Sequence, residues 1–469
     1  MEIFRKKSIQ EMIQTTQQGT TLRKELNAVD LAMLGVGAII GTGIFVLTGV
    51  GSLVTGPALP LSFIIAGFTC LLAAFTYAEF ASLVPVSGST YTYSYATLGE
   101  FFAWVIGWDL ILEYLLAVSS VSVGWSGYFQ SLLAGFGIEI PHVLTQSPLI
   151  DGTSILNLPA FLIILFITWL LSIGVKESKR VNNIMVLIKV AVILLFILVG
   201  AFYVKPENWT PFMPFGIKGV FQGAALIFFS YLGFDAVSTA AEETKNPAKD
   251  LPKGILWSLG IVTLLYMIVS ALMTGIVPFQ QFEKHADAPV AYAISMTGQD
   301  WLVGIVSLGA AIGMITVMLV MLYGQIRIIF AMSRDGLMPK FLSKVHKKYR
   351  TPYVSTWTLG LIAAFLGAFV PLDQLAELVN LGTLAAFVLI SVAVIVLRYK
   401  QPDLPRKFKT PLVPYVPILA IIFCCVLAFN LEVMTWIRFL GWFAAGLIFY
   451  LVYGYEHSNL RKKSDSNSQ

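Results

Sequence analysis

The chain has 469 residues, of which 57% are hydrophobic and only 12% are charged, and its formal net charge is +5. So few charged groups cannot cover the surface of a soluble globule of this length, and the composition therefore predicts a membrane protein. The small positive charge follows from lysines and arginines near the ends of apolar segments, so no nucleic-acid partner is expected.

Residues 1–27 are expected to form a cytoplasmic tail. Their basic cluster is followed by a polar run over residues 8–21, so the apolar core of a cleaved signal peptide is missing. The first spanning segment would then act as its own insertion signal.

Twelve apolar segments follow, each near the length of about 20 residues that crosses a bilayer. They are centred near residues 40, 68, 116, 166, 194, 230, 265, 316, 361, 386, 421 and 445. We therefore expect an all-α membrane protein with 12 transmembrane helices in one transporter domain, residues 28–454. Residues 455–469 would form a second cytoplasmic tail.

The distribution of lysine and arginine predicts the orientation, because cytoplasmic connections carry the excess of these residues. If the N-terminus is inside, Lys189 lies within a span and four basic residues lie outside: Lys205, Lys218, Lys284 and Arg438. All the others of the 31 fall inside, so both termini are expected in the cytoplasm. Residues 85–99 are expected to form an inside loop, although they carry no basic residue, and their PVSGS run at 85–89 is expected to lie against the protein instead of in water.

Two spans contain glycine where a membrane helix should be continuous: residues 35–45 read GVGAIIGTGIF and residues 228–235 read FFSYLGFD. Glycine weakens a helix by about 1 kcal/mol relative to alanine. Non-helical backbone at this depth is tolerated only where protein or a water-filled cavity satisfies it. The glycines would either pack helices closely or mark a substrate site. A Rossmann phosphate loop is excluded because no βαβ unit flanks the glycines.

The positions of the two interruptions also suggest an internal repeat. If helices 1 to 5 and 6 to 10 are copies of one unit, the odd number of helices puts the copies in opposite orientations. The interruptions then fall at matching places. The expected repeats are residues 28–204 and 219–398, with helices 11 and 12 in residues 413–454.

A pair of broken helices is complementary to an amino acid zwitterion. The N–H groups that begin a half-helix favour an anion, and the free carbonyls of the opposite half-helix favour an ammonium group. The carboxylate is expected at Gly41, Thr42 and Gly43, and the ammonium at Ile40, Phe228 and Phe229, with Tyr231 and Gly233 completing the second interruption.

Ionisable groups within spans are costly and are usually functional. Lys189 lies about 9 Å into the fifth span at 1.5 Å per residue, where it would carry the coupling proton or be a snorkelling or paired structural lysine. Asp109 and Glu113, four residues apart, share a face of the third span. Glu113 would face the substrate cavity, with structural pairing as the alternative, and Asp235 would cap the second half of the sixth span.

Large side chains near the interruptions are candidates for closing the cavity. Phe229 is the expected gate and Tyr266 its polar neighbour. Met318 and Met321 would line a side-chain pocket, for which adaptable methionine is suited. The alternative for all four is simple packing between helices.

No pattern in the chain predicts an enzyme, a metal site or a cofactor. The histidines, His142, His285, His346 and His457, fall in expected loops or tails, and the three cysteines fall in apolar spans as packing residues. The hydrolase, metalloprotease and nucleotide-binding motifs that would indicate catalysis are missing.

The chain resembles the amino acid, polyamine and organocation superfamily, near the cationic amino acid transporters. The resemblance rests on residues 35–45 and 228–235, on PVSGS at 85–89 followed by YTY at 91–93, on Glu242 and Glu243, on residues 246–252, and on MSRDG at 332–336. It implies a LeuT-like fold of two inverted five-helix repeats with discontinuous helices 1 and 6. It also implies that Lys189 replaces sodium in proton-coupled members, and that Glu113, Tyr266 and Met321 line the substrate cavity.

The expected function is proton-coupled uptake of L-amino acids through the plasma membrane by alternating access. The partners would be an amino acid, a proton and membrane lipids, together with an unidentified small membrane protein. An exchanger without proton coupling and an amino acid sensor that does not transport are the alternatives. A channel is disfavoured, because it would need a continuous pore lined by selective groups.

Overall fold

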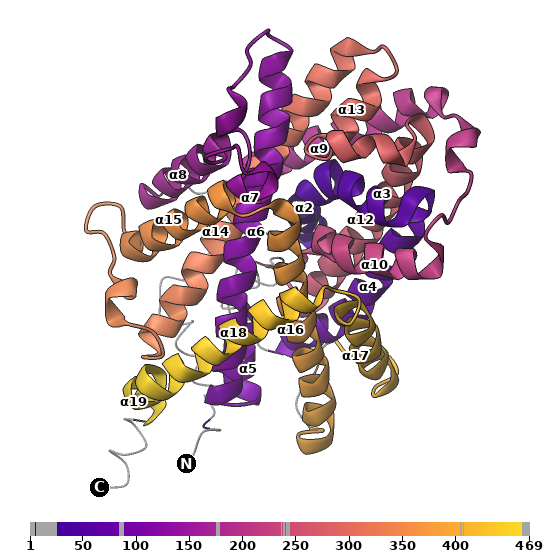
Figure 1. Cartoon of the computed structure of the whole chain (residues 1–469). Coiled ribbons are helices and arrows are strands. Elements are labelled where there is room, and N and C mark those ends of the chain that lie inside the picture. Colours follow the sequence, from indigo (N-terminus) through magenta and orange to yellow (C-terminus); the bar gives the residue numbers. More distant parts are fainter. Residues whose placement is uncertain are drawn as a thin grey trace, which may run out of the picture.

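The computed structural model describes residue 5 and residues 26–83, 89–174, 179–235, 237, 240, 244–403, 406 and 408–461. Within these ranges the chain forms helices and loops, with one isolated β-bridge between Leu26 and Thr244. Figure 1 shows the helices gathered in one bundle, with both termini at the same end.

The first half of the described chain contains α2 (Ala28–Ile39), η1 (Gly43–Leu47), α3 (Thr48–Thr55), η2 (Gly56–Ala58), α4 (Leu59–Leu83), α5 (Ser89–Thr97), α6 (Glu100–Ala134), η3 (His142–Leu144), α7 (Pro148–Asp151), α8 (Leu158–Ser172), α9 (Lys179–Gly200), η4 (Ala201–Tyr203) and η5 (Pro206–Trp209). The second half contains α10 (Gly216–Ile227), η6 (Phe228–Tyr231), α12 (Pro247–Ile276), η8 (Phe279–Lys284), α13 (Pro289–Ser295), α14 (Asp300–Arg334), η9 (Lys340–Ser343), α15 (Tyr353–Phe369), α16 (Leu372–Lys400), α17 (Tyr415–Ala428), α18 (Val433–Phe449), η10 (Tyr450–Gly454) and α19 (Tyr455–His457).

Many of these helices have the length and composition of membrane spans. Among the described residues, seven helical stretches are long and apolar enough to cross a bilayer, and four shorter helices of similar character accompany them: α2, α8, α15 and α17. Large apolar side chains are exposed on several of these helices, as expected for a surface that faces lipid. The chain is therefore a multi-pass membrane protein.

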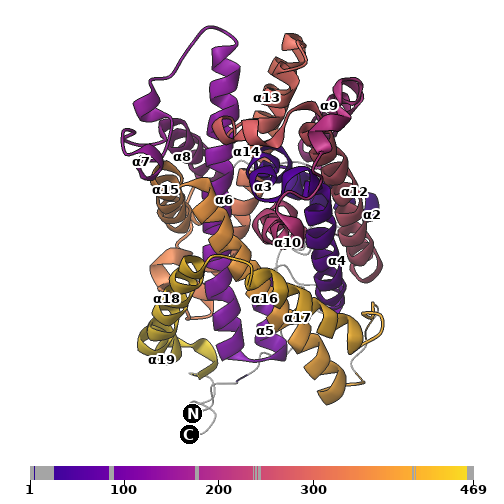
Figure 2. The ribbon, with the colours of Figure 1, turned by 45° about the vertical axis from the view of Figure 1, so that its right-hand side comes forward.

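The helices α6 and α14 form the centre of the bundle. They pack against each other, and 89% of the residues in the most apolar part of α6 are buried inside the protein. By contrast, α17 packs against α4 and α16, and α18 against α6 and α16, on one side of the bundle (Figure 2). The substrate-site candidates lie on the elements around α6.

The two glycine-rich stretches interrupt regular α-helix, as the sequence predicts. In the first, α2 ends at Ile39, Ile40 has an extended ψ of 101°, and the chain re-enters helix as the π-helical turn η1. In the second, α10 ends at Ile227, the 3₁₀-helix η6 follows, and Leu232 leaves helical geometry with a ψ of 143°.

One prediction needs correction: the expected inside loop at residues 85–99 contains a helix, α5. Its sequence, STYTYSYAT, carries no apolar periodicity, but Tyr91 and Tyr95 are four residues apart and both are buried. The Tyr91 hydroxyl donates to Asp335 over 2.7 Å, and the Tyr95 hydroxyl donates to Glu100 over 3.0 Å. The long-range contact of Tyr91 with Asp335 and the local contact of Tyr95 with Glu100 hold this helix in place. The run that was expected to lie against the protein falls almost wholly at residues 85–88, outside the described residues.

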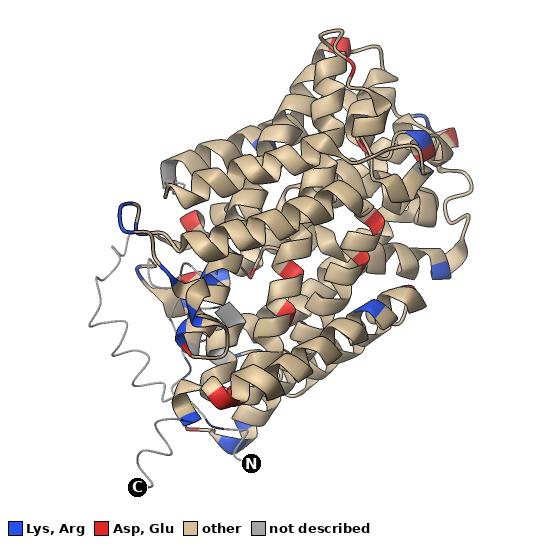
Figure 3. Ribbon diagram, turned by 60° about the vertical axis from the view of Figure 1, so that its left-hand side comes forward, with Lys and Arg blue, Asp and Glu red and all other residues tan. Residues whose placement is uncertain are grey.

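Basic residues gather at the end of the bundle where the termini lie (Figure 3). There α14 ends at Arg334, and Gly336 follows with a φ of +83°, a backbone conformation that favours glycine. The backbone N–H of Asn459 donates to the Asp335 carbonyl over 3.0 Å, so the start of the expected C-terminal tail packs on this helix end. Apart from residues 5, 26 and 27, the expected N-terminal tail lies outside the described residues.

Candidate functional site

The two interruptions touch each other through glycine. A Cβ atom added to Gly43 would lie 2.5 Å from the Ser230 Cβ and 2.6 Å from its Cα, so the two backbones are in contact there. Gly233 has a φ of +110°, and a Cβ there would lie 2.8 Å from the carbonyl oxygen of Ala38. The glycines therefore do pack segments closely, and the segments that they join are the two interruptions.

One hydroxyl bridges the two interruptions. Tyr266, on α12 and fully buried, lies with its hydroxyl 3.0 Å from the Ile39 carbonyl and 2.9 Å from the Ser230 carbonyl. A phenol has one hydrogen, so the two carbonyls share a single donor. At least one of them therefore keeps acceptor capacity for another donor, such as an ammonium group.

Two hydroxyls at the contact are buried without a partner. The side chains of Thr42 and Ser230 are each 1% exposed, and neither hydroxyl has a hydrogen-bond partner within the described chain. A buried polar group without a partner is costly, and such groups in native structures call for an explanation. The N–H groups at the start of a helix also lack intrahelical acceptors. Hydroxyls and N–H groups in this arrangement can bind a carboxylate.

Lys189 lies on α9 and is fully buried, with its ammonium nitrogen 2.7 Å from the Gly37 carbonyl oxygen. This carbonyl belongs to the last turn of α2, where the interruption removes the N–H group that a continuous helix would supply. The lysine therefore serves the first interruption directly. It does not snorkel to the surface.

Three carboxylates gather beside the second interruption. Glu113 and Asp109, both buried on α6, lie near each other, and Asp235 is close to Glu113. Asp235 accepts a hydrogen bond of 2.7 Å from the Tyr114 hydroxyl, which gives it a partner on α6. The helix that Asp235 was expected to cap lies largely outside the described residues. Both carboxylate oxygens of Asp109 lack a hydrogen-bond partner in the described part of the chain.

The remaining predicted residues are buried inside the bundle. Ile40, Phe228, Phe229, Met318 and Met321 are all buried. Val317, beside the two methionines on α14, approaches Gly41, where an added Cβ would lie 2.9 Å from its Cγ2. The Tyr231 hydroxyl instead donates to the Phe63 carbonyl on α4 over 2.7 Å, so this tyrosine anchors η6 to a neighbouring helix.

Sequence reasoning missed two residues at the interruptions. Ser230 lies inside the predicted segment but was given no role, although its hydroxyl is one of the two without a partner. Asn380, on α16, donates to the Ala225 and Leu226 carbonyls at the end of α10. The available signal was an amide side chain inside the predicted span centred near residue 386.

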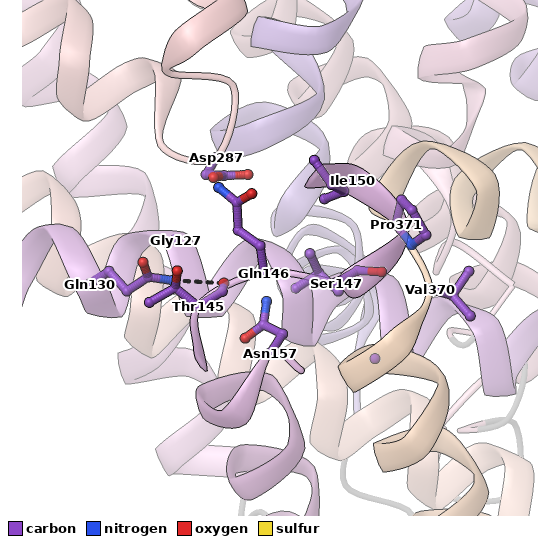
Figure 4. A pocket seen from close by; sticks show the side chains of 12 residues that line it. Gly127, Gln130, Thr145, Gln146, Ser147, Ile150, Asn157, Asp287, Val370 and Pro371 are labelled. Carbon is purple, nitrogen blue, oxygen red and sulfur yellow. Dashed lines mark hydrogen bonds between the residues drawn. The ribbon is translucent and has the colours of Figure 1, made fainter. Parts of the chain in front are cut away.

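A separate recess lies at the end of the bundle opposite the termini. It is narrow, and its polar lining includes Gln130, Gln146, Asn157 and Asp287 (Figure 4). Asp287 and Gln146 point toward each other there. The Asp287 side chain keeps contact with solvent, yet the protein crowded around it raises the pKa of its carboxyl by desolvation, and His285 nearby opposes this by lowering it. The described residues contain no group of histidine, cysteine and acidic side chains that could hold a metal ion.

Comparison with known proteins assigns a family to this architecture. The family model for amino acid permeases matches residues 26–452. The branched-chain amino acid permease BcaP of Bacillus subtilis is 62% identical over 98% of this chain and 99% of its own length. The methylthioribose transporter of the same organism is 52% identical over 98% of this chain and 99% of its own length. The vacuolar cationic amino acid transporter 4 of Arabidopsis thaliana is 40% identical over 81% of this chain and 64% of its own length. All three are named as permeases or transporters, not as enzymes.

Proposed function

The chain belongs to the amino acid permease family, and we propose that it is a secondary active transporter that takes up L-amino acids with a proton. The substrate zwitterion binds between the two helix interruptions. The Thr42 hydroxyl and the N–H groups of Gly41, Thr42 and Gly43 bind its carboxylate. The carbonyls around Ile40, Phe228 and Phe229 bind its ammonium.

The observation that carries this proposal is the pair of buried hydroxyls of Thr42 and Ser230, which lie without partners at the contact between the interruptions. A ligand with a carboxylate and an ammonium would supply the missing hydrogen bonds. Because Gly43 and Ser230 are in contact in this conformation, the substrate enters when the two segments move apart. Alternating access is the motion that does this, with one group of helices rocking against the other.

Proton coupling is assigned to Lys189. Its ammonium is held by the Gly37 carbonyl at the end of α2, so its protonation state changes the stability of the first interruption. Loss of the proton removes the positive charge from this carbonyl and favours release of the substrate. An exchanger without proton coupling would use the same site with a permanently charged lysine.

The preferred substrates are proposed to be branched-chain amino acids. Val317, Met318 and Met321 place an apolar wall on α14 beside the first interruption, which suits an aliphatic side chain. The name of the Bacillus subtilis relative BcaP supports the same choice. Glu113 lies on α6 near Asp109 and Asp235. Its carboxyl is not needed to bind an apolar side chain.

The proposed architecture has 12 transmembrane helices, with helices 1 to 5 and 6 to 10 forming inverted repeats. α2, η1 and α3 form helix 1, and α10 and η6 begin helix 6. The protein lies in the plasma membrane with the basic end and both termini in the cytoplasm (Figure 3). The recess around Asp287 then opens to the outside.

Uptake into liposomes tests the proposal. Purified protein in liposomes with an acidic outside solution should accumulate L-leucine saturably, and L-isoleucine and L-valine should compete where D-leucine does not. Methylthioribose is tested as a further competitor, because one relative is named as a methylthioribose transporter. Uptake of none of the twenty amino acids, or equal uptake of both enantiomers, would contradict the proposal. Exchange without accumulation would select the uncoupled exchanger.

A further inference from the structure

Asn380 is a buried amide in the apolar helix α16, and its side chain is 0% exposed. Its amide nitrogen donates one hydrogen bond to the Ala225 carbonyl and one to the Leu226 carbonyl, each over 2.8 Å. Both hydrogens of the amide are therefore used. Its oxygen has no hydrogen-bond partner among the residues that the structure describes.

The two carbonyls belong to the end of α10, where the second interruption begins. In a continuous α-helix they would accept from the N–H groups of Phe229 and Ser230. Those residues lie in the 3₁₀-helix η6, whose hydrogen bonds reach three residues back instead of four. In that pattern the Phe229 N–H reaches the Leu226 carbonyl and the Ser230 N–H reaches the Ile227 carbonyl, so the change of helix type leaves the Ala225 carbonyl without a backbone donor. No water is present in the lipid core to supply one. The Asn380 amide donates to the Ala225 carbonyl and adds a second hydrogen bond at Leu226.

The first interruption has a donor in the corresponding place. The Lys189 ammonium binds the Gly37 carbonyl at the end of α2 and follows that residue by 152 positions, while Asn380 follows Ala225 by 155. Each interruption thus receives a hydrogen-bond donor from a later helix, and the number of residues between the carbonyl and its donor is nearly the same in both cases. The two donors differ in chemistry, because an ammonium can lose its proton and a carboxamide stays neutral.

We propose that Asn380 is the positioning residue of the second interruption and the proton-independent counterpart of Lys189. It fixes the end of α10, so that η6 presents its carbonyls to the substrate ammonium at every stage of the protonation cycle. α16 also contacts η6 directly, and the Phe387 ring lies 6.0 Å from the Phe228 ring. The inference rests on the proposed function, because it assigns Asn380 a role at the proposed substrate site.

Asn380→Ala tests the role in substrate binding. In liposomes preloaded with L-leucine, the apparent affinity of the variant for external L-leucine should fall about tenfold or more, because two buried carbonyls lose a donor. The loss should be the same at acidic and alkaline pH. Asn430→Ala is the matched control: Asn430 donates to the Val426 carbonyl over 2.8 Å at the exposed end of α17, away from both interruptions. That control should keep the wild-type affinity.

Asn380→Asp adds a readout that a purely structural role would not move. A protonated aspartic acid keeps one donor for these carbonyls, whereas an ionised one has none and places a negative charge against their oxygens. Affinity in exchange should therefore be near that of the wild type at acidic pH and fall as the pH rises. The acidic groups near this region, Asp109, Glu113 and Asp235, are unchanged, so the pH profile is compared with those of the wild type and of Asn380→Ala.

The outcomes are distinct. Asn380→Ala with wild-type affinity, or Asn380→Asp with a wild-type pH profile, overturns the inference while leaving amino acid transport standing. If Asn380→Ala fails to fold, as judged by gel filtration in detergent, the profile of Asn380→Asp decides alone. If the wild-type protein neither transports nor exchanges any amino acid, the proposed function fails and this inference fails with it.

Discussion

At the scale of single residues, Lys189 shows how a charged group is retained in an apolar bundle. Its ammonium replaces the N–H group that the end of α2 lacks, so the cost of burying the charge is offset by a hydrogen bond to a backbone carbonyl. The same bond links the charge to the interruption. We therefore expect a change in the protonation of Lys189 to alter the backbone around the proposed carboxylate subsite.

Lys189→Ala should abolish accumulation of L-leucine driven by a pH gradient and leave exchange between preloaded amino acids measurable. The variant removes the group to which we assign the coupling proton, whereas the proposed carboxylate-binding groups of Gly41, Thr42 and Gly43 remain. Accumulation and exchange are both measured in the same liposomes. Lys253→Ala, which removes an exposed lysine of α12, is the control. Preserved accumulation in Lys189→Ala would reject the assignment of the proton.

Gly43→Ala should impair binding through crowding. The added methyl group would lie 2.5 Å from the Ser230 Cβ, and overpacking of this kind costs about 1–3 kcal/mol. The affinity for L-leucine should fall about tenfold. Gly260→Ala on α12 is the matched control, because a Cβ there meets no atom within 4 Å. Equal affinities for both variants would show that the close contact of the interruptions has no role in binding.

At the scale of elements, α4 and α16 are joined by an ion-pair cluster near the basic end. Glu79 of α4 accepts two hydrogen bonds of 2.9 Å from Arg398 of α16, lies 3.1 Å from the Arg406 guanidinium, and accepts the Thr410 N–H over 2.7 Å. Glu79 and Arg406 side chains are each 2% exposed. The cluster therefore links α4 to α16 and to the segment that follows α16.

Glu79→Gln should lower the free energy of unfolding by about 3–5 kcal/mol, because it leaves buried guanidinium charge without its counter-charge. An earlier midpoint of thermal unfolding in detergent, followed by tryptophan fluorescence, would report this. Glu432→Gln, at an exposed position before α18, should leave the midpoint unchanged. A Glu79→Gln midpoint equal to that of the wild type would show that the cluster contributes little.

The sequence predicted the elements whose signal is local. The two interruptions contain glycines at places where a membrane helix should be continuous, and this signal is visible in the sequence itself. α5 was missed because a polar tyrosine-rich stretch gives no helical periodicity, and the contact of Tyr91 with Asp335, 244 residues away, is invisible in the local sequence. Asn380 was missed for the same reason: its meaning depends on carbonyls more than 150 residues away. The shared donor Tyr266 was predicted as a site neighbour, but not its bridge between the two interruptions.

At the scale of the whole molecule, the end opposite the termini carries the recess around Asp287. The protein crowded around this solvent-contacting side chain raises the pKa of its carboxyl by desolvation, so the folded state binds its proton more tightly than the unfolded state does. The Asp287 carboxyl therefore lowers the free energy of unfolding more and more as the pH rises from its pKa in the unfolded state to its pKa in the folded state. Below the unfolded pKa its effect disappears.

Asp287→Asn should therefore raise the thermal midpoint at neutral pH and have less effect as the pH is lowered through the carboxyl titration. The substitution keeps the shape of the side chain and removes the charge that the recess disfavours. Thermal unfolding across that pH range gives the difference. A stabilisation that is independent of pH would assign the effect to something other than the Asp287 charge.

The central claim is that two interrupted helices bind both charged ends of one amino acid. Binding of L-leucine, isopentylamine and isocaproate to the purified protein, measured by ligand-induced thermal stabilisation, tests it most directly, because the two analogues lack the carboxylate and the ammonium respectively. The account predicts stabilisation by L-leucine and little or none by either analogue. Stabilisation by either analogue equal to that by L-leucine would contradict it.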